Sequence, residues 1–245
     1  MALPEITGWQ TESLRVTLIA NEPVMAAGKN WFKNATGIDP HQVTHKPSTA
    51  EYSESAPFLK GQLELRVSFN RVDWLYTTEE PHGPVLPTLG DASEVLTSLI
   101  EPIEKWLNND DTLFVRAAVG PVFFYAVDKP SQGTQTLLAY LPFLHIDPEA
   151  AREVFMQINF PSVSKKVEGL ELNRLCKFRT IGVQIINVAP GNSFPSMAPR
   201  FFCRAELDFS TDGMRTIPLP AANRMDLVNE LHVACREILN VGVGP

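Results

Sequence analysis

Two histidines with metal-ligand spacing, His41 and His45, are the first side chains in the sequence whose arrangement could do chemistry. Histidines four residues apart bind zinc when both rings project from one face of a helix. Here Pro40 and Pro47 bracket the pair, which predicts a loop instead of a helix. No cysteine or carboxylate follows at ligand spacing. We therefore expect no metal site.

Two further arrangements resemble parts of catalytic sites. His145 and Asp147 could form a general base and the carboxylate that orients it, but Asp147 precedes Pro148 and is better explained as a helix N-cap. The thiol of Cys176 lies close to Arg174 in sequence, and a neighbouring cation lowers a thiol pKa. Strand alternation, however, turns Cys176 toward the core. We predict no catalytic residue and expect binding rather than enzymatic activity.

The glycines do not form a phosphate-binding loop. Such a loop joins a strand to a helix and points its amide groups at the phosphate. Gly182, Gly191, Gly213 and Gly242 lie at no junction of this kind. We therefore predict no nucleotide site and no cofactor.

Two polar clusters are candidate binding surfaces. The first lies at a predicted turn and contains Arg71, Asp73 and Trp74. It is a candidate because an aromatic ring beside a charged pair is typical of recognition surfaces. The alternative is that Arg71 and Asp73 pair locally while Trp74 lies in the core. The second cluster is a basic stretch, since arginine can bind a phosphate or a carboxylate with two hydrogen bonds. Its residues are Lys165, Lys166, Asn173, Arg174, Lys177 and Arg179.

The composition is that of an ordinary globular protein, with 44% hydrophobic and 20% charged residues in a chain of 245. No apolar run approaches the roughly 18–20 residues of a membrane span, and the N-terminus lacks the features of a secretory signal. The three cysteines, Cys176, Cys203 and Cys235, lie in apolar segments and fit small core side chains in a reducing compartment. We predict a cytoplasmic protein without a membrane partner.

The net charge of −7 is unevenly distributed along the chain. Residues 1–130 carry 10 Lys and Arg against 17 Asp and Glu, while residues 131–245 carry 11 against 11. An acidic surface repels polyphosphate, so nucleic acid is not the expected partner of the first half. The difference in charge predicts a protein partner or self-association instead.

Alternation predicts strands, and a period of 3.6 residues predicts helices. The clearest helix begins after Asp91, which caps it, is kinked by Pro102 and ends near Leu107. The other predictions for the first half are strands at 14–19, 63–69 and 72–77, a helix to about Ala35 capped by Asn21, a loop at 38–58, and a hairpin of 113–119 with 122–127.

In the second half, a capping residue followed by a proline again predicts the start of a helix. A strand is predicted at 136–141, and Asp147 with Pro148 predicts a helix to about Ile158. Strands at 178–188 and 201–209 follow, joined by a loop at 190–199, and a last helix at 225–239 stops at Gly242.

The helices at 95–107 and 227–239 align without gaps, and each follows a strand and a Leu-Pro pair. We interpret this order as an internal repeat. The predicted fold is therefore α+β, with two related β-α-β-β-α halves that are ferredoxin-like or helix-grip-like, each an antiparallel sheet with helices on one face. The halves are residues 1–130, which are acidic, and 131–245, which are neutral.

The function predicted from these features is a non-enzymatic binding or scaffold protein, a subunit of a larger bacterial assembly. One alternative is a small-ligand-binding protein or an enzyme with a pocket between sheet and helices. Another is binding of an anion or a single-stranded nucleic acid by the basic stretch at 165–179.

Overall fold

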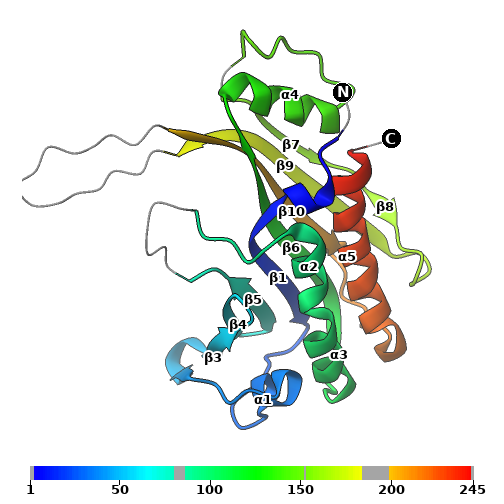
Figure 1. Cartoon of the computed structure of the whole chain (residues 1–245). Helices are drawn as coiled ribbons and strands as arrows, with labels where there is room; N and C mark the ends of the chain where they lie inside the picture. The colour runs from blue at the N-terminus through cyan, green and yellow to red at the C-terminus, as the bar shows by residue number, and fades with distance from the viewer. Residues whose placement is uncertain (1–2, 80–85, 152, 184–198, 244–245) are drawn as a thin grey trace, which may run out of the picture.

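The computed structural model describes residues 3–79, 86–151, 153–183 and 199–243. In these ranges ten strands form one antiparallel sheet (Figure 1). The strand order is β2-β3-β4-β5-β1-β6-β10-β9-β7, and β8 pairs separately with β9. The sheet is thus the frame on which every other element lies.

The first part of the chain forms five strands on one side of the sheet and three helices. These are β1 (Gln10–Ala20), α1 (Trp31–Thr36), β2 (Gln42–Lys46), β3 (Glu51–Phe58), β4 (Gly61–Ser68), β5 (Arg71–Thr77), α2 (Ala92–Ser98) and α3 (Ile100–Asn108), with short 3-10 helices η1 (Ile6–Gly8) and η2 (Pro47–Thr49).

The remaining chain forms the other side of the sheet and two longer helices. These elements are β6 (Phe114–Val127), α4 (Pro130–Tyr140), β7 (Phe155–Asn159), β8 (Ser162–Val163), β9 (Glu171–Val183), β10 (Arg200–Thr211), the 3-10 helix η3 (Ala221–Asn223) and α5 (Arg224–Val241).

The sheet is continuous because β1 and β6 pair with each other from Gln10 opposite Phe124 to Ala20 opposite Phe114. The prediction of two β-α-β-β-α halves, ferredoxin-like or helix-grip-like, is therefore wrong. Two separate small sheets would each have left one of these apolar strands as an exposed edge, and pairing the two strands removes both edges.

Outward from this central pair the strands follow the order β1-β5-β4-β3-β2 on one side and β6-β10-β9-β7 on the other. The helices of the sequence alignment, α2 with α3 and α5, lie side by side on one face and run in opposite directions (Figure 1). The internal repeat itself stays a prediction. So does the boundary between residues 130 and 131, across which β6 pairs with β10.

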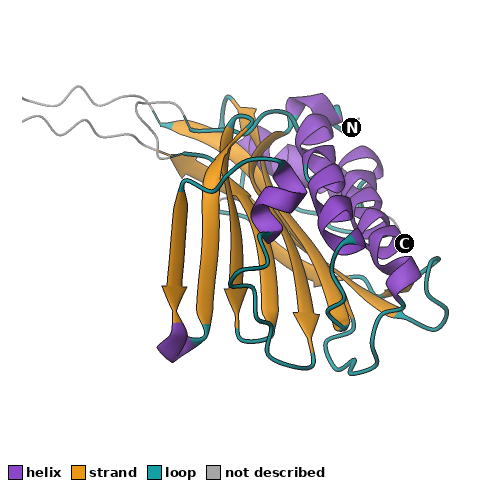
Figure 2. Cartoon of the chain, turned by 90° about the horizontal axis from the view of Figure 1, so that it is seen from below, coloured by secondary structure: helices purple, strands orange, loops and turns teal. Residues whose placement is uncertain are grey.

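Helices cover one face of the sheet, as Figure 2 shows. The alternation of β1 explains why, since Leu14, Val16 and Leu18 are fully buried toward the helices while Arg15 and Ile19 point to the other side. We call the side covered by helices the helix face and the opposite side the open face.

Aromatic side chains fill the core beneath the helices. Trp106 of α3 lies with its ring centroid 5.5 Å from those of Trp31 and Phe114 and 5.6 Å from that of Trp74. Edge-to-face and tilted contacts of this kind add to the free energy of burial. They fasten the short helix α1 to the sheet through α3.

A hydrogen-bonded pair ties together the other end of the core. The indole nitrogen of Trp9 donates to the hydroxyl of Tyr140 at 2.8 Å, and that hydroxyl donates to the carbonyl of Leu239 at 3.1 Å. Burial raises the pKa of Tyr140 to about 12. The phenol therefore stays a neutral donor, and it links η1, α4 and α5.

Several predicted elements are confirmed. The side chain of Asp91 caps α2 by accepting from the amides of Ser93 and Glu94. The helix is interrupted at Leu99, so that Pro102 falls in the first turn of α3, where its missing N–H costs no helical hydrogen bond. The last helix, α5, ends at Gly242 as predicted.

The predicted helix to Ala35 is wrong over most of its length, because only residues 31–36 are helical. Gly28 and Asn30 have positive φ angles of 81° and 52°, which a helix cannot include. Asn21 does not cap a helix, and its amide donates to the carbonyl of Thr216.

The predicted loop at 38–58 contains the strands β2 and β3. All five residues of β2 are exposed, so this strand has no apolar alternation that sequence could reveal. The predicted hairpin at Gly120-Pro121 is also wrong, since β6 continues through both residues. Pairing with β1 holds them in the extended conformation.

Two predictions in the second half are reversed. Residues 136–141 are not a strand but belong largely to α4, which begins at Pro130 and buries Thr134, Leu137 and Tyr140 on one side. Beyond Asp147 there is a turn and then the strand β7. In both segments packing against the sheet overrides local propensity. The predicted loop at 190–199, except its last residue, and the last five residues of the predicted strand at 178–188 lie outside the described residues.

All three cysteines are buried and free of disulfides, which confirms the prediction that they are core side chains. None of the helices within the described residues combines the length and apolar character needed to cross a bilayer.

His232 in α5 is buried and generates a prediction about pH. Its Nδ1 contacts the carbonyl of Val228 at 2.9 Å, whereas its Nε2 has no partner among the described residues. Burial lowers the pKa of His232 from 6.5 to about 4, against the opposing effect of the hydrogen bond. Between these values the unfolded chain binds more protons than the folded protein.

The free energy of unfolding should therefore fall as the pH falls from 6.5 toward 4, by about 3 kcal/mol for this group. Urea unfolding at several pH values checks this in wild type and in His232→Leu, which should lose this part of the pH dependence. His145→Leu, at an exposed histidine, is the control. Equal pH dependence in wild type and His232→Leu would contradict the assignment.

Candidate functional site

The open face carries a row of charged side chains across the central strands. On β10, Arg204, Glu206 and Asp208 point to this face because Ala205 and Leu207 between them are buried. In a strand, every second residue shares a face. The charges of β10 are therefore aligned along the middle of the open face, next to those of β1 and β9.

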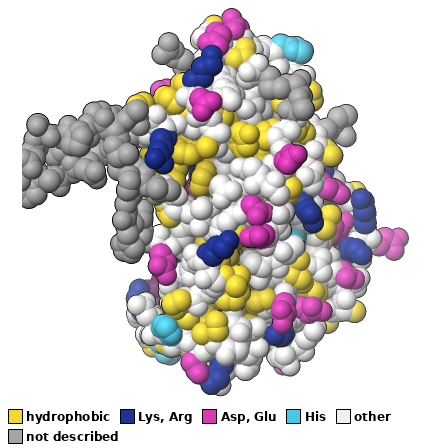
Figure 3. Space-filling model, in the orientation of Figure 1, with side chains coloured by type: hydrophobic (Ala, Val, Ile, Leu, Met, Phe, Trp, Pro, Cys, Tyr) yellow, Lys and Arg dark blue, Asp and Glu magenta, His cyan; other side chains and the backbone are white. Residues whose placement is uncertain are grey.

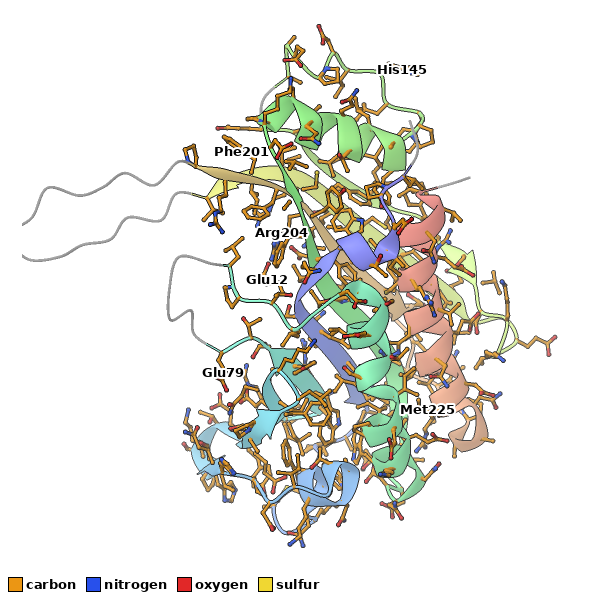
Figure 4. All side chains as sticks on the ribbon, viewed as in Figure 1. Glu12, Glu79, His145, Phe201, Arg204 and Met225 are labelled. Carbon is orange, nitrogen blue, oxygen red and sulfur yellow. The ribbon has the colours of Figure 1, made fainter. Side chains whose placement is uncertain are left out.

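Arg204 is the centre of this row. Its Nε and Nη2 donate to the carboxylate of Glu12 at 2.9 and 3.1 Å, and its Nη1 donates to Glu206 at 3.1 Å. Glu206 in turn accepts from Lys177 of β9 at 2.7 Å. Figure 4 shows Glu12 and Arg204 together on the side away from α5. We call Glu12, Arg204, Glu206 and Lys177 the central ion-pair network.

A β-bulge brings Glu12 into this network. The register of β1 with β6 shifts between Thr11 and Ser13, so Glu12 has no partner residue on β6. Such a bulge redirects a side chain. Here it aims the carboxylate of Glu12 at Arg204, although β6 lies between the two strands.

Arg15 crosses β6 in the same way to reach Asp208, with 3.3 Å between its Nη2 and the carboxylate. Gly120 is the residue of β6 directly opposite Arg15. A Cβ atom at Gly120 would lie 3.1 Å from Nη2 of Arg15. The absence of a side chain at Gly120 thus lets the guanidinium lie across the backbone of β6.

Hydrogen bonds within the network favour the charged forms of Arg204 and Glu206. Burial by itself would lower the pKa of Arg204, but the hydrogen bonds and charges of Glu12 and Glu206 outweigh it and raise that pKa. The hydrogen bond from Lys177 lowers the pKa of Glu206, and the charge of Arg204 lowers it further. Two acids and two bases therefore compensate each other at the centre of the open face.

A cavity of about 350 Å³ lies at one end of the network. Its floor includes Phe124 of β6, whose ring is 5.6 Å from that of Phe202 in an edge-on contact. Both rings are on the open face and are nevertheless buried, with exposed fractions of 8% and 6%. The residues that line the cavity are Glu12, Thr78, Leu86, Pro87, Phe124, Arg179, Ile181 and Arg204.

The two guanidinium groups of this cavity differ in exposure. The side chain of Arg204 is 14% exposed and fixed by its carboxylate partners. Arg179 is exposed and forms no ion pair with another residue of the described ranges. The charged residues that line the cavity are Glu12, Arg179 and Arg204. The lining therefore carries one net positive charge. Elsewhere, acidic and basic side chains are interspersed on the surface seen in Figure 3.

The first predicted polar cluster is divided by the sheet. Arg71 and Asp73 point to the open face and form a two-bonded ion pair, with Nε and Nη2 of Arg71 at 2.6 and 2.9 Å from the carboxylate oxygens. The hydroxyl of Thr17 also donates to Asp73. Trp74 points the other way and is fully buried in the core.

The basic stretch is divided as well. Lys177 and Arg179 lie on the open face. Arg174 is at an even-numbered position of β9, so its side chain points to the opposite face, where it lines a groove beside α5. Lys165 and Lys166 line the same groove, together with Glu230. Asn173 accepts a hydrogen bond from Asn159 at 2.8 Å. These residues therefore do not form one continuous basic surface.

Sequence reasoning missed Glu12, Phe124 and Arg204. The signal for Arg204 was present, because β10 alternates charged residues with Ala205 and Leu207, the pattern of a strand with one polar face. For Glu12 there was no such signal, since its contact depends on a bulge.

The candidates for catalysis and metal binding are not brought together. His45 contacts Tyr52 at the exposed edge of the sheet, and His145 is exposed in the segment between α4 and β7. Burial raises the pKa of Cys176 to about 12. Within the described ranges, no three His, Cys, Asp or Glu side chains are arranged to hold a metal ion.

Comparison with known proteins finds no protein-family model and no curated protein that matches the chain. The argument for a function therefore depends on the geometry of the site.

The buried position of Arg204 predicts that its ion pairs affect stability more than those at exposed sites. Arg204→Met leaves Glu12 and Glu206 without their shared partner and should lower the free energy of unfolding by about 1–3 kcal/mol. Arg66→Met is the control, because Arg66 pairs with Glu64 while its side chain is 52% exposed, and it should cost less than about 1 kcal/mol.

Urea unfolding of both variants measures the difference. The single variant Glu12→Gln and the double variant Arg204→Met with Glu12→Gln then give the coupling between Arg204 and Glu12. Equal losses for Arg204→Met and Arg66→Met, or no coupling, would contradict the central position of the network.

Proposed function

We propose that the protein is a non-enzymatic binding protein and that its ligand occupies the open-face cavity between the Leu86-Pro87 segment and the strands β6, β9 and β10. The ligand class is an anionic group attached to an apolar body. The observation that carries this proposal is the pairing of a fixed guanidinium, Arg204, with an exposed one, Arg179, beside an aromatic floor.

The apolar part of the proposal depends on Phe124, Ile181, Leu86 and Pro87. A binding site for a small molecule is typically an apolar concavity with a few polar groups that fix orientation. These four residues form the apolar part of the lining. An aromatic or aliphatic body of up to about 350 Å³ would fit beside Phe124.

The anionic part depends on Arg179. The charge of Arg204 is already compensated by Glu12 and Glu206. Arg204 therefore adds a fixed, planar guanidinium group to the cavity but little net positive charge. Arg179 adds an exposed guanidinium that can bind a carboxylate or sulfonate with two hydrogen bonds. An amphipathic anion thus matches both the shape and the charge of the cavity.

Binding of a partner protein, as a subunit of a larger assembly, is a second candidate. It is favoured by the open face, which no described helix covers and whose ion pairs are compensated within the sheet. Binding of a single-stranded nucleic acid is favoured less, because the sheet separates Lys165, Lys166 and Arg174 from Lys177 and Arg179.

The first candidate is tested with two fluorescent probes that share an apolar body. 1-Anilinonaphthalene-8-sulfonate carries the anion, and N-phenyl-1-naphthylamine is its uncharged analogue. The native protein should bind the sulfonate more tightly. Arg179→Gln should weaken sulfonate binding about tenfold, as expected for loss of one charge-assisted contact worth about 1.4 kcal/mol, and should leave binding of the amine unchanged.

Arg236→Gln is the matched control, because Arg236 is an exposed arginine of α5 on the helix face. It should alter neither probe. Phe124→Ala should weaken both probes, since it removes the aromatic floor. The proposal fails if the native protein binds neither probe, or if Arg179→Gln and Arg236→Gln bind the sulfonate equally well.

A further inference from the structure

The two edges of the sheet differ in their chemistry. One edge is β2, a strand of five exposed residues with Lys46 at its end and prolines on either side. The other edge is formed by β7 and β8, which follow one another along β9. Exposed edges are commonly protected against pairing by charged residues or prolines.

The β7–β8 edge lacks charged residues. No Lys, Arg, Asp or Glu lies between Glu153 and Lys165. Two of its apolar side chains are exposed, Phe155 at 60% and Val163 at 61%. Pro161 separates the two strands, so the uninterrupted part of the edge is β7, residues Phe155–Asn159.

The hydrogen bonds on either side of β7 identify its free backbone groups. The amide of Thr180 donates to Val154, and the amide of Phe160 donates to Arg174. Residues 154, 156, 158 and 160 therefore direct their backbone groups toward β9, because bonded positions alternate along an antiparallel strand. Phe155, Gln157 and Asn159 direct theirs outward, where no other strand of the described residues pairs with them.

We propose that β7 pairs with β7 of a second copy of this chain, in antiparallel orientation about a two-fold axis at Gln157. In this register Phe155 of one copy faces Asn159 of the other, and Met156 faces Ile158. The N–H and C=O groups of Phe155, Gln157 and Asn159 all gain partners. The two sheets become one continuous sheet across the dimer.

A second copy supplies a strand with the side chains that this edge requires. The axis places Gln157 next to its own counterpart, where a charged side chain would meet a like charge, and Gln157 is neutral. The other facing positions of β7, Phe155 with Asn159 and Met156 with Ile158, also bring no charges together. Met156 and Ile158, which already pack against the core, would continue its apolar layer across the interface.

This pairing is independent of the proposed ligand site, because none of the residues of β7 lines the open-face cavity. Failure of one proposal therefore leaves the other standing.

Light scattering coupled to size-exclusion chromatography measures the assembly of the full chain over a range of concentrations. Wild type should show twice the monomer mass. Gln157→Lys places two ammonium groups near the axis and should raise the dimer dissociation constant at least tenfold. The control is Thr44→Lys, the same change at the centre of the exposed β2 edge, which should leave the dimer intact.

Gln157→Cys provides a positive test of the register. Residues that face each other across a two-fold axis in antiparallel strands lie within the Cα distance of a disulfide, so mild oxidation should cross-link Gln157→Cys and not Thr44→Cys. The three native cysteines are buried. A wild type that stays monomeric at high concentration, or a dimer disrupted by Thr44→Lys and not by Gln157→Lys, would overturn the proposal.

Discussion

The antiparallel pairing of β1 with β6 is the interaction on which the rest of the structure depends. These two strands are far apart in sequence, and each is the first strand of its part of the chain. Once they pair, β5 lies beside β1 and β10 lies beside β6. The helices that follow β5 and β10 must then all cover the same face of the sheet. The apolar residues of both parts then share one core.

The same pairing determines what the other face can carry. Side chains that alternate with the core residues point away from the helices, and in β1, β10 and β9 several of them are charged. Partly buried charges are tolerated only when they are compensated. Glu12, Arg204, Glu206 and Lys177 meet this requirement across neighbouring strands, and a bulge and a glycine supply the backbone geometry for it.

The two contacts proposed for the described surface use different physics. The cavity beside Phe124 and Arg179 combines an apolar floor with a guanidinium group, and it suits a small amphipathic anion. The β7 edge offers main-chain hydrogen bonds and no charge, and it suits another strand. Neither requires a reactive side chain.

The sequence by itself determined the elements whose signals are local. Asp91 as a cap, the interruption near Pro102 and the last helix each depend on neighbours within a few residues. Alternation also predicted that Cys176 points inward. Only the tertiary structure decided which strands pair, and this choice overrode local propensity in α4 and β7, where a strand and a helix had been expected.

The candidate site shows the same division. Arg71, Asp73, Lys177 and Arg179 could be selected from sequence, but the sheet separates them from Trp74 and Arg174 because adjacent strand residues point to opposite faces. The contact of Glu12 with Arg204 joins positions 192 residues apart. No local pattern encodes such a contact, since it requires β6 to lie between β1 and β10.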